Sequence, residues 1–240
     1  MLSIIVPAYN EAARIGESLR SIVAYMETKG FDFEVVVVDD CSRDATASVV
    51  GDVAREDAHV RLVSHASNLG KGGAVRTGVR ISKGDAVMFS DADLSTPIEE
   101  LERLLPWLET HELVIASRSL PASEVVVHQP FYREWMGRIY NVFVQALVVR
   151  GIIDTQCGFK LMTRRAADAI FALARVNSFS FDVEVILIAK RLGFKVKEVP
   201  VRWINSRASK VHPVVDSLEM LLDLFRIKFY DMIGCYKKTS

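Results

Sequence analysis

The chain has 240 residues, and 50% of them are hydrophobic, which is enough for a substantial core in one large domain or two small ones. The 30 Lys and Arg residues balance the 30 Asp and Glu residues, so the formal net charge at pH 7 is zero. This balance argues against nucleic acid as a partner, and any anion site must come from a local cluster of charge.

Cysteine usage and hydropathy point to a chain that works inside the cell and does not span a membrane. Cys41, Cys157 and Cys235 are far apart and lack C-x-x-C spacing, which favours reduced thiols over disulfides or a zinc site. Residues 1–6 enter a strand-like run without the basic segment and cleavage site of a signal peptide. The longest apolar run, 139–149, is shorter than the roughly 20 residues that cross a bilayer.

Apolar runs alternate with helix-like segments through the first half of the chain. The predicted strands are short continuous apolar runs, and the predicted helices carry apolar residues at helical spacing. The expected strand and helix pairs are 2–8 with 12–26, 33–38 with 44–54, 60–63 with 72–81, and 86–89 with 97–108. This alternation predicts an α/β fold whose mixed, mostly parallel sheet is covered by helices on both faces.

The alternation becomes less regular after a fifth predicted strand at 113–116. Beyond it we expect a polar loop at 155–160, a strand at 195–201, and helices at 131–149, 164–173, 182–192 and 214–233. No repeat or flexible linker interrupts the chain, so we expect a single domain over 1–240. The last helix is amphipathic, and such a helix either packs on the body of a protein or rests in a membrane interface.

Asp91-Ala92-Asp93 directly follows the predicted strand at 86–89. Two carboxylates on alternate residues at a strand end can share Mg²⁺ or Mn²⁺, because these hard cations prefer oxygen ligands. The alternative is an ordinary acidic turn. Ligands of parallel sheets bind at the carboxyl ends of the strands, so the position favours a metal that carries a diphosphate.

Other polar clusters follow the first two predicted strands: Tyr9, Asn10, Glu11, Asp39 and Asp40. A carboxylate at a strand end can accept the N–H of a base or the hydroxyl of a ribose, and Asp40 is our main candidate. The alternative is that Asp40 and Ser42 cap the helix beginning near residue 44. We expect capping for Ser42 and ligand binding for Asp40.

Cationic and glycine-rich segments supply candidate anion sites. Residues 68–73, which include Asn68 and Lys71, resemble a loop whose backbone N–H groups bind an anion at a helix start, although a simple glycine turn is the alternative. Arg118 follows the fifth strand, and Arg133 opens an apolar helix. These two arginines, together with Lys210 in a basic loop, could bind phosphate oxygens or could be surface cations.

The order of these motifs resembles the inverting family 2 glycosyltransferases with the GT-A fold. The motifs of the first half are IVPAYNE at 5–11, VVDDCS at 37–42, NLGKGG at 68–73 and DAD at 91–93. Later segments are similar to polyprenyl-phosphate hexosyltransferases, most of all to dolichyl-phosphate β-glucosyltransferases: 116–118, 128–133, 156–160, 181–184 and 198–203.

The resemblance implies UDP-glucose as donor, a polyprenyl (dolichyl) phosphate as acceptor, inversion at the anomeric carbon, and a bound Mg²⁺ or Mn²⁺. Residues 1–118 would bind the nucleotide sugar and 119–240 the acceptor. Asp91 and Asp93 would hold the metal and, with Arg118 and Arg133, form the catalytic set. The implied nucleotide-sugar ligands are Pro7, Tyr9, Asn10, Glu11, Asp39, Asp40, Asn68, Lys71, Asp91, Ala92 and Asp93. The implied acceptor ligands are Arg133, Gln156, Lys160, Asp182, Glu184 and Lys210.

Several alternatives stay open at this point. Ser95 stands where the mannosyl branch commonly has Gln, which favours glucose over a GDP-mannose donor. A hydroxyl-acceptor enzyme would use Asp182 or Glu184 as a base, whereas a lipid phosphate is already an anion, and both side chains could instead form structural salt bridges. We expect peripheral attachment to the cytoplasmic face of a membrane, through 131–149 and the tail, because the chain lacks the N-terminal anchor of eukaryotic glucosyl enzymes.

Overall fold

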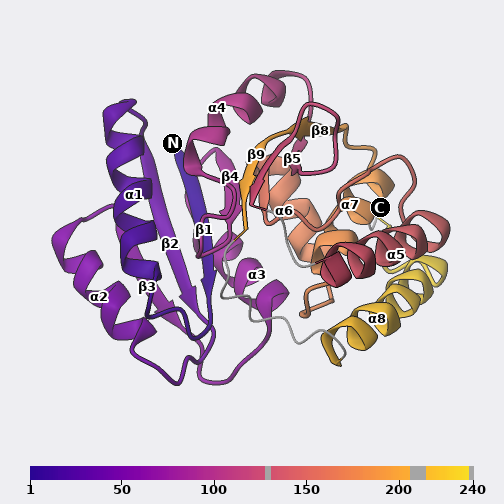
Figure 1. Cartoon of the computed structure of the whole chain (residues 1–240), viewed down its shortest axis with the longest axis horizontal. Coiled ribbons are helices and arrows are strands. Elements are labelled where there is room, and N and C mark those ends of the chain that lie inside the picture. Colours follow the sequence, from indigo (N-terminus) through magenta and orange to yellow (C-terminus); the bar gives the residue numbers. More distant parts are fainter. Residues whose placement is uncertain (128–130, 206–214, 238–240) are drawn as a thin grey trace.

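The computed structural model describes residues 1–127, 131–205 and 215–237, and for 131–134 and 215–217 it describes the backbone alone. Its centre is a seven-stranded sheet with the strand order β3-β2-β1-β4-β7-β5-β8 (Figure 1). Strands on both sides of residue 118 therefore belong to one sheet, and the predicted α/β class with a mixed, mostly parallel sheet is confirmed.

The first four strands are parallel and lie where the apolar runs predicted them. They are β1 (Leu2–Ala8), β2 (Phe33–Asp39), β3 (Val60–Ser64) and β4 (Ala86–Ser90). Strands β5 (Leu113–Ser117) and β8 (Val196–Pro200) form a second parallel pair. Long apolar runs predict such strands well because helices bury both faces of the sheet.

Strand β7 (Phe159–Thr163) joins the two parallel groups and runs antiparallel to both β4 and β5. The sequence prediction of a loop at 155–160 was therefore wrong for its last two residues. Lys160 interrupts the apolar run by which a buried strand is predicted. Its side chain is nevertheless fully buried in the structure. Since β4 and β5 are both antiparallel to β7, their carboxyl ends lie at the same edge of the sheet.

Helices cover both faces of the sheet, and alternate residues of each strand point to opposite cores. Ile4 and Val6 of β1 belong to one buried cluster with α1 (Ile15–Thr28), α2 (Thr46–Glu56) and α4 (Leu101–Leu104). Ile5 belongs to the other cluster. That cluster includes residues of α3 (Lys71–Ile81), α5 (Phe131–Leu147), α6 (Arg164–Leu173), α7 (Phe181–Arg191) and α8 (Val215–Met232).

Two local features differ from the predicted elements. The predicted helix at 97–108 is broken into a turn of 3₁₀-helix, η1 (Ile98–Glu100), then α4, then η2 (Leu105–Glu109). Pro106 explains the break in part, because proline lacks the N–H that continues an α-helix. A short second sheet, β6 (Glu124–Val127) paired with β9 (Arg202–Ile204), was not predicted. Within the described residues, no helix has both the length and the apolar character needed to cross a bilayer.

Candidate active site

The candidate site lies at the carboxyl edge of the sheet, where the loops after β1, β2, β4 and β5 meet. In the described part of the chain, three residues other than glycine have a positive φ: Asn10 (54°), Cys41 (62°) and Leu94 (46°). Each stands in one of these loops. Left-handed backbone is unfavourable for residues with a side chain, and it gathers at functional sites.

The D-x-D carboxylates each contact a cation. Lys71 Nζ lies 2.6 Å from Asp91 Oδ1, and Arg14 Nη1 lies 3.4 Å from Asp93 Oδ2. The backbone N–H of Ser95 donates to Asp93 Oδ1 at 3.0 Å, which fixes that carboxylate. The structure therefore places Lys71, Asp91 and Asp93 together, as predicted, and adds Arg14, which the sequence analysis missed.

Charge keeps Lys71 protonated although it is largely buried. Burial alone would lower the pKa of its ammonium group, but Asp91, then Asp182 and Asp93, more than offset this and hold the pKa above its ordinary value. The pKa of Arg14 is raised in the same way, with Glu11 and Asp93 outweighing burial. Lys71 and Arg14 thus stay charged beside the two aspartates at the strand end.

The donor set at residues 91–93 fits a divalent cation. The side chains of Asp91 and Asp93 are 36% and 18% exposed, so both are open to a ligand. Gly158 leaves room for Asp91: a Cβ at residue 158 would lie 2.1 Å from Asp91 Oδ2. Two accessible carboxylates on alternate residues supply the hard oxygen ligands that Mg²⁺ and Mn²⁺ prefer.

Asp40 binds the loop that leads into α3. Its carboxylate accepts the backbone N–H groups of Leu69 (2.8 Å) and Gly70 (2.7 Å), and it lies 2.7 Å from Nδ1 of His65. The Asn68 amide donates to the Asp40 carbonyl at 3.0 Å. The proposed anion loop is therefore filled by the protein's own carboxylate, and Asp40 acts on Lys71 by holding the start of its helix.

The loop after β1 is tied to the loop after β2. The Asn10 N–H donates to Ser42 Oγ at 2.9 Å, and Asn10 Oδ1 accepts the Arg43 N–H at 2.7 Å. Ser42 was predicted to cap α2, and this is wrong, because the helix begins later, at Thr46, where Asp44 accepts the N–H. The geometry depends on tertiary contacts between two loops, which local sequence does not reveal.

The remaining predicted nucleotide-sugar ligands line the same edge. Tyr9 is exposed, Glu11 accepts from Arg14 at 2.9 Å, and Asp39 is buried and accepts the Ser42 N–H at 3.3 Å. Pro7 lies in β1, and Ala92 is buried between the two aspartates.

Arg118 is held by the buried carboxylate of Asp154, which the sequence analysis missed. Its backbone N–H, Nε and Nη2 donate to the Asp154 carboxylate at 2.9, 2.7 and 2.8 Å, and the guanidinium stacks over Trp203. Glu198 in turn accepts the Asp154 N–H at 2.7 Å and the Ser117 hydroxyl at 2.6 Å. Burial lowers the pKa of Arg118, but Asp154 outweighs it, with a smaller contribution from Asp91. Arg118 is thus a cation held in place by Asp154 and attracted electrostatically by Asp91 of the D-x-D.

Lys160 and Asp182 form a buried ion pair under the site. Lys160 Nζ contacts Asp182 and donates to the Cys157 carbonyl at 2.8 Å. Burial raises the pKa of Asp182, although Lys160 and Lys71 oppose this shift. Both side chains were predicted to bind the acceptor. The structure gives them protein partners instead, so they position the loop that contains Gln156.

Glu184 is also engaged by the protein. Its carboxylate accepts the backbone N–H groups of Arg175 (2.9 Å) and Val176 (2.9 Å) and the hydroxyl of Tyr236 (2.6 Å). Of the two roles considered for Glu184, these contacts favour the structural one. The partners are backbone amides and a tyrosine rather than the salt bridge considered from sequence.

Three predicted acceptor ligands are less completely described. The Gln156 N–H donates to Asp154 at 3.2 Å, and its buried Nε2 has no hydrogen-bond partner among the described residues. Arg133 is in the first turn of α5, but its side chain is outside the described part of the chain, and Lys210 is outside it altogether.

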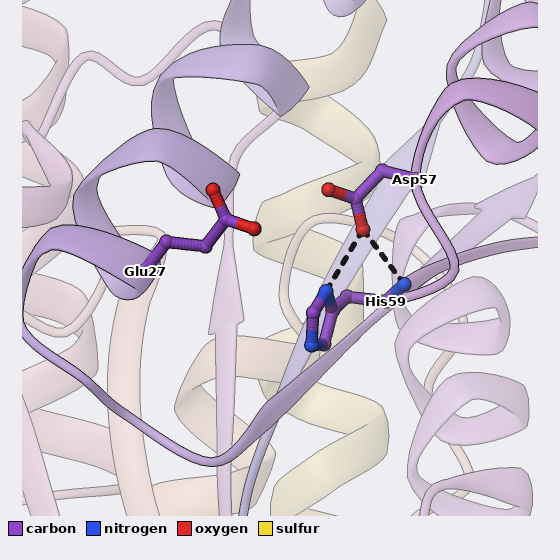
Figure 2. A group of neighbouring side chains, drawn as sticks. All are labelled: Glu27, Asp57 and His59. Atoms are coloured by element: carbon purple, nitrogen blue, oxygen red, sulfur yellow. Dashed lines mark hydrogen bonds and ion pairs between the residues drawn. The ribbon is translucent and has the colours of Figure 1, made fainter.

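A second group of side chains of the types that can bind a metal lies at the opposite edge of the sheet, before β3. Figure 2 shows Glu27 facing Asp57 and His59. The Asp57 carboxylate accepts the His59 backbone N–H at 2.8 Å and lies 2.9 Å from the ring Nδ1, while the ring stacks on Phe33. These contacts close the turn before β3.

Comparisons with known proteins agree with this fold. The model of the family described as "Glycosyl transferase family 2" matches residues 3–171. The chain belongs to this family.

Curated relatives cover nearly the whole chain. A dolichyl-phosphate beta-glucosyltransferase of Dictyostelium discoideum is 36% identical, with 100% of this chain and 77% of the relative aligned. The Homo sapiens protein of that name is 33% identical over 98% of this chain and 77% of its own length. The Saccharomyces cerevisiae protein is 31% identical over 100% and 77%.

Solved structures share the fold at lower identity. Mannosyl-3-phosphoglycerate synthase from Rubrobacter xylanophilus has a TM-score of 0.72 at 20% identity, covering 100% of this chain and 77% of its own. Glucosyl-3-phosphoglycerate synthase from Mycobacterium tuberculosis, in complex with Mn²⁺, UDP and glucosyl-3-phosphoglycerate, has a TM-score of 0.71 at 20% identity, covering 100% and 81%. The resemblance stated from the motifs is thereby confirmed.

Proposed function

We propose that this protein transfers glucose from UDP-glucose to the phosphate of a polyprenol such as dolichol, forming polyprenyl-phosphate glucose with inversion at the anomeric carbon. The observation that carries the proposal is the similarity, over the whole chain, to proteins named dolichyl-phosphate beta-glucosyltransferase in three distant organisms. The cluster at Asp91 and Asp93 supplies the chemistry that such a transfer requires.

Asp91 and Asp93 would hold Mg²⁺ or Mn²⁺. A divalent cation bound there neutralises diphosphate oxygens and so makes UDP a better leaving group. The two carboxylates are fixed for this task, Asp93 by the Ser95 N–H and Asp91 by its backbone bond to the Gly158 carbonyl at 3.1 Å.

Lys71, Arg14 and Arg118 act on charge that develops during transfer. Each of the three is paired with a carboxylate in the structure, and Arg118, whose partner is buried, needs little reorganisation when the bond to UDP breaks. Lys71 and Arg14 contact the D-x-D itself and would face the diphosphate. Arg118 approaches from β5, beside the acceptor half, and would bind phosphate oxygens.

The acceptor phosphate oxygen would attack the anomeric carbon as the bond to UDP breaks on the opposite side. A phosphate monoester is already an anion at neutral pH, because its second pKa is about 6, so no residue has to act as a general base. Asp182 and Glu184, the candidate bases of a hydroxyl-acceptor enzyme, are both engaged by protein partners. These contacts favour a phosphate acceptor.

The place of action proposed for the protein is the cytoplasmic face of a membrane, with peripheral attachment. A polyprenyl phosphate has to be taken from a lipid phase. The three cysteines are free thiols, which fits a reducing compartment.

A panel of donors and acceptors tests the function. The protein is incubated with labelled UDP-glucose or GDP-mannose, and with either a polyprenyl phosphate or the matching free polyprenol. We expect label in the organic phase with UDP-glucose and the phosphate alone. Label from GDP-mannose would assign the mannosyl reaction, and label on the free alcohol would assign a hydroxyl acceptor; either result would overturn the proposal.

A further inference from the structure

Helix α5 presents an apolar face to the solvent. Its exposed large apolar residues follow one side of the helix at spacings of three and four: Trp135, Ile139, Val142 and Phe143. The opposite side is buried at Val144. A helix on a protein surface ordinarily turns polar residues toward the solvent, whereas this side of α5 exposes apolar ones.

Helix α8 also exposes apolar residues to the solvent, over a greater length. Its exposed residues are Leu218, Leu222, Phe225, Phe229 and Met232, and Ile233 follows the helix. They are at least half exposed, up to 73% for Met232. The inward side of the helix is separately apolar, with Leu224 and Ile227 fully buried. The outward stripe therefore has no partner in the described part of the chain.

The two helices lie side by side, at the opposite end of the molecule from β3 and α2 (Figure 1). Val144 of α5 and Leu224 and Ile227 of α8 belong to one buried cluster. We call the exposed apolar residues of α5 and α8 the two-helix face. Large apolar side chains that gather at an exposed surface mark an interaction site.

Among the described side chains of α5 and α8 and the segment after α8, exposed basic residues outnumber exposed acidic ones. Arg138 on α5 and Lys237 after α8 are exposed, and residues 135–147 contain no acidic residue. On α8, Arg226 is exposed while its partner Asp223 is buried, and Asp231 is likewise covered by Arg191. Among the side chains of α8 that the structure describes, Glu219 is the exposed acid.

The two-helix face is joined to the acceptor half of the site. Tyr140 of α5 lies 3.1 Å from the Ser180 hydroxyl, which donates to the Met220 carbonyl of α8 at 3.2 Å. Ser180 directly precedes α7, whose Asp182 holds Lys160. Hydrogen bonds through Ser180 therefore connect α5 and α8 to the start of the helix that carries Asp182.

We propose that the two-helix face is a docking surface for a lipid bilayer that contains anionic lipids. Aromatic and aliphatic side chains enter the region between headgroups and acyl chains, and the basic rim meets anionic headgroups. This inference rests on the proposed function, because a lipid-borne phosphate must reach the site from a bilayer. Docking on this face would present the acceptor half of the site to that lipid.

Vesicle binding tests the face directly. The protein is sedimented with phosphatidylcholine vesicles with or without phosphatidylglycerol. We expect binding that is stronger with phosphatidylglycerol and weaker at high salt. The variants Phe225→Ser/Phe229→Ser and Trp135→Ser/Val142→Ser should each bind more weakly by about tenfold or more. Each loses two apolar side chains that would be buried in the bilayer. Trp107→Ser, at an exposed tryptophan outside the face, is the matched control and should bind like the wild type.

Fluorescence gives a second readout that does not depend on a serine variant folding. Lipids brominated near the headgroup should quench the protein's tryptophan fluorescence. Quenching should be lost in Trp135→Phe and retained in Trp107→Phe. Equal quenching in both variants, or vesicle binding unchanged in both serine double variants, would overturn the proposed docking surface.

Activity separates this proposal from the proposed function. With a polyprenyl phosphate embedded in vesicles, the Phe225→Ser/Phe229→Ser variant should transfer glucose poorly, whereas with a water-soluble short-chain prenyl phosphate it should match the wild type. Vesicle binding without transfer to either acceptor would contradict the proposed function and leave the docking surface standing. A dimer in light scattering that the same variant converts to a monomer would assign the face to a second copy of the chain and overturn the membrane proposal.

Discussion

Individual cations of the site are held by carboxylates whose burial differs sharply. The pair of Lys71 and Asp91 is partly exposed, whereas Asp154, which holds Arg118, is only 4% exposed. An exposed pair can open to admit a ligand at small cost, but a buried charge that loses its partner is strongly unfavourable. Lys71 is therefore suited to change partners during turnover, and Arg118 is suited to stay fixed.

Asp154→Asn should destabilise the fold in a pH-dependent way. Burial raises the pKa of Asp154, but the interactions with Arg118 lower it by more. The pKa in the folded state is therefore below the unfolded value of 3.8. Its stabilising contribution is therefore complete above that value and is lost as the pH falls through the lower folded pKa. We expect a loss of about 3 kcal/mol at neutral pH, because Arg118 loses its buried partner.

Urea unfolding at neutral pH and at about pH 3 measures this difference. The gap between wild type and Asp154→Asn should shrink at acid pH. Asp168→Asn, at the exposed partner of Arg164, is the control and should change stability little at either pH. A gap of equal size at both pH values would show that Asp154 does not act through its charge.

Residues whose place is set by local sequence could be predicted, and contacts that depend on a distant partner could not. Asp91, Asp93 and Lys71 follow strand ends or begin a helix, and the structure brings them together. Asp154 and Arg14 acquire their roles from partners that only the folded chain supplies. For the same reason Asp40 was assigned to a ligand, although it holds a loop that is distant in sequence.

Strand β7 is the element that connects the two halves of the molecule, and it begins at the D-x-D. Gly158 directly precedes it, and the Gly158 carbonyl accepts the Asp91 N–H. A short strand interrupted by a buried lysine carries no clear period in the sequence, so its place between β4 and β5 could not be predicted. The long apolar strands β1 and β2 could, because both of their faces are buried.

Gly158→Ala should lower turnover more than stability. The new Cβ would lie 2.1 Å from Asp91 Oδ2 and 2.4 Å from its Cγ, so the carboxylate must move away from its present position. We expect turnover to fall by about tenfold or more, as displacing one group that stabilises developing charge commonly does. Gly51→Ala, in a helix where nothing lies within 4 Å of the added Cβ, is the control and should leave turnover unchanged.

Steady-state kinetics and thermal unfolding of the two glycine variants separate the effects. If Gly158→Ala kept wild-type turnover, the position of Asp91 in the structure would not be the one required for transfer.

The contact between α7 and the C-terminal segment is structural in this account. Tyr236→Phe removes the hydroxyl that donates to Glu184 in a buried setting, and we expect a loss of about 1–2 kcal/mol in the free energy of unfolding. Turnover at a temperature where the variant is folded should be unchanged. Reduced turnover with unchanged stability would instead place Glu184 in the transfer reaction.

At the scale of the whole molecule, one continuous sheet carries residues of both proposed halves, the one for the donor and the one for the acceptor. Strands β1 to β4 end at the D-x-D and the loops around it, while β7, β5 and β8 add Arg118 and the buried Lys160 pair. Helices α5 and α8 extend this second half to an exposed apolar face. The fold class could be predicted from alternation of strands and helices, but the outward apolar stripes became visible only with the exposure of each side chain.

The central claim is that Asp91 and Asp93 promote transfer from UDP-glucose to a lipid phosphate with a divalent cation. The most direct measurement is the rate at which labelled glucose enters the organic phase, for the wild type, Asp91→Ala and Asp93→Ala, after chelation and after Mn²⁺ or Mg²⁺ is restored. We expect the wild type to lose activity with chelator and regain it with metal, and each variant to fall about a hundredfold or more while it unfolds at nearly the wild-type temperature. Near-wild-type transfer by a folded variant, with chelator and with metal alike, would contradict the account.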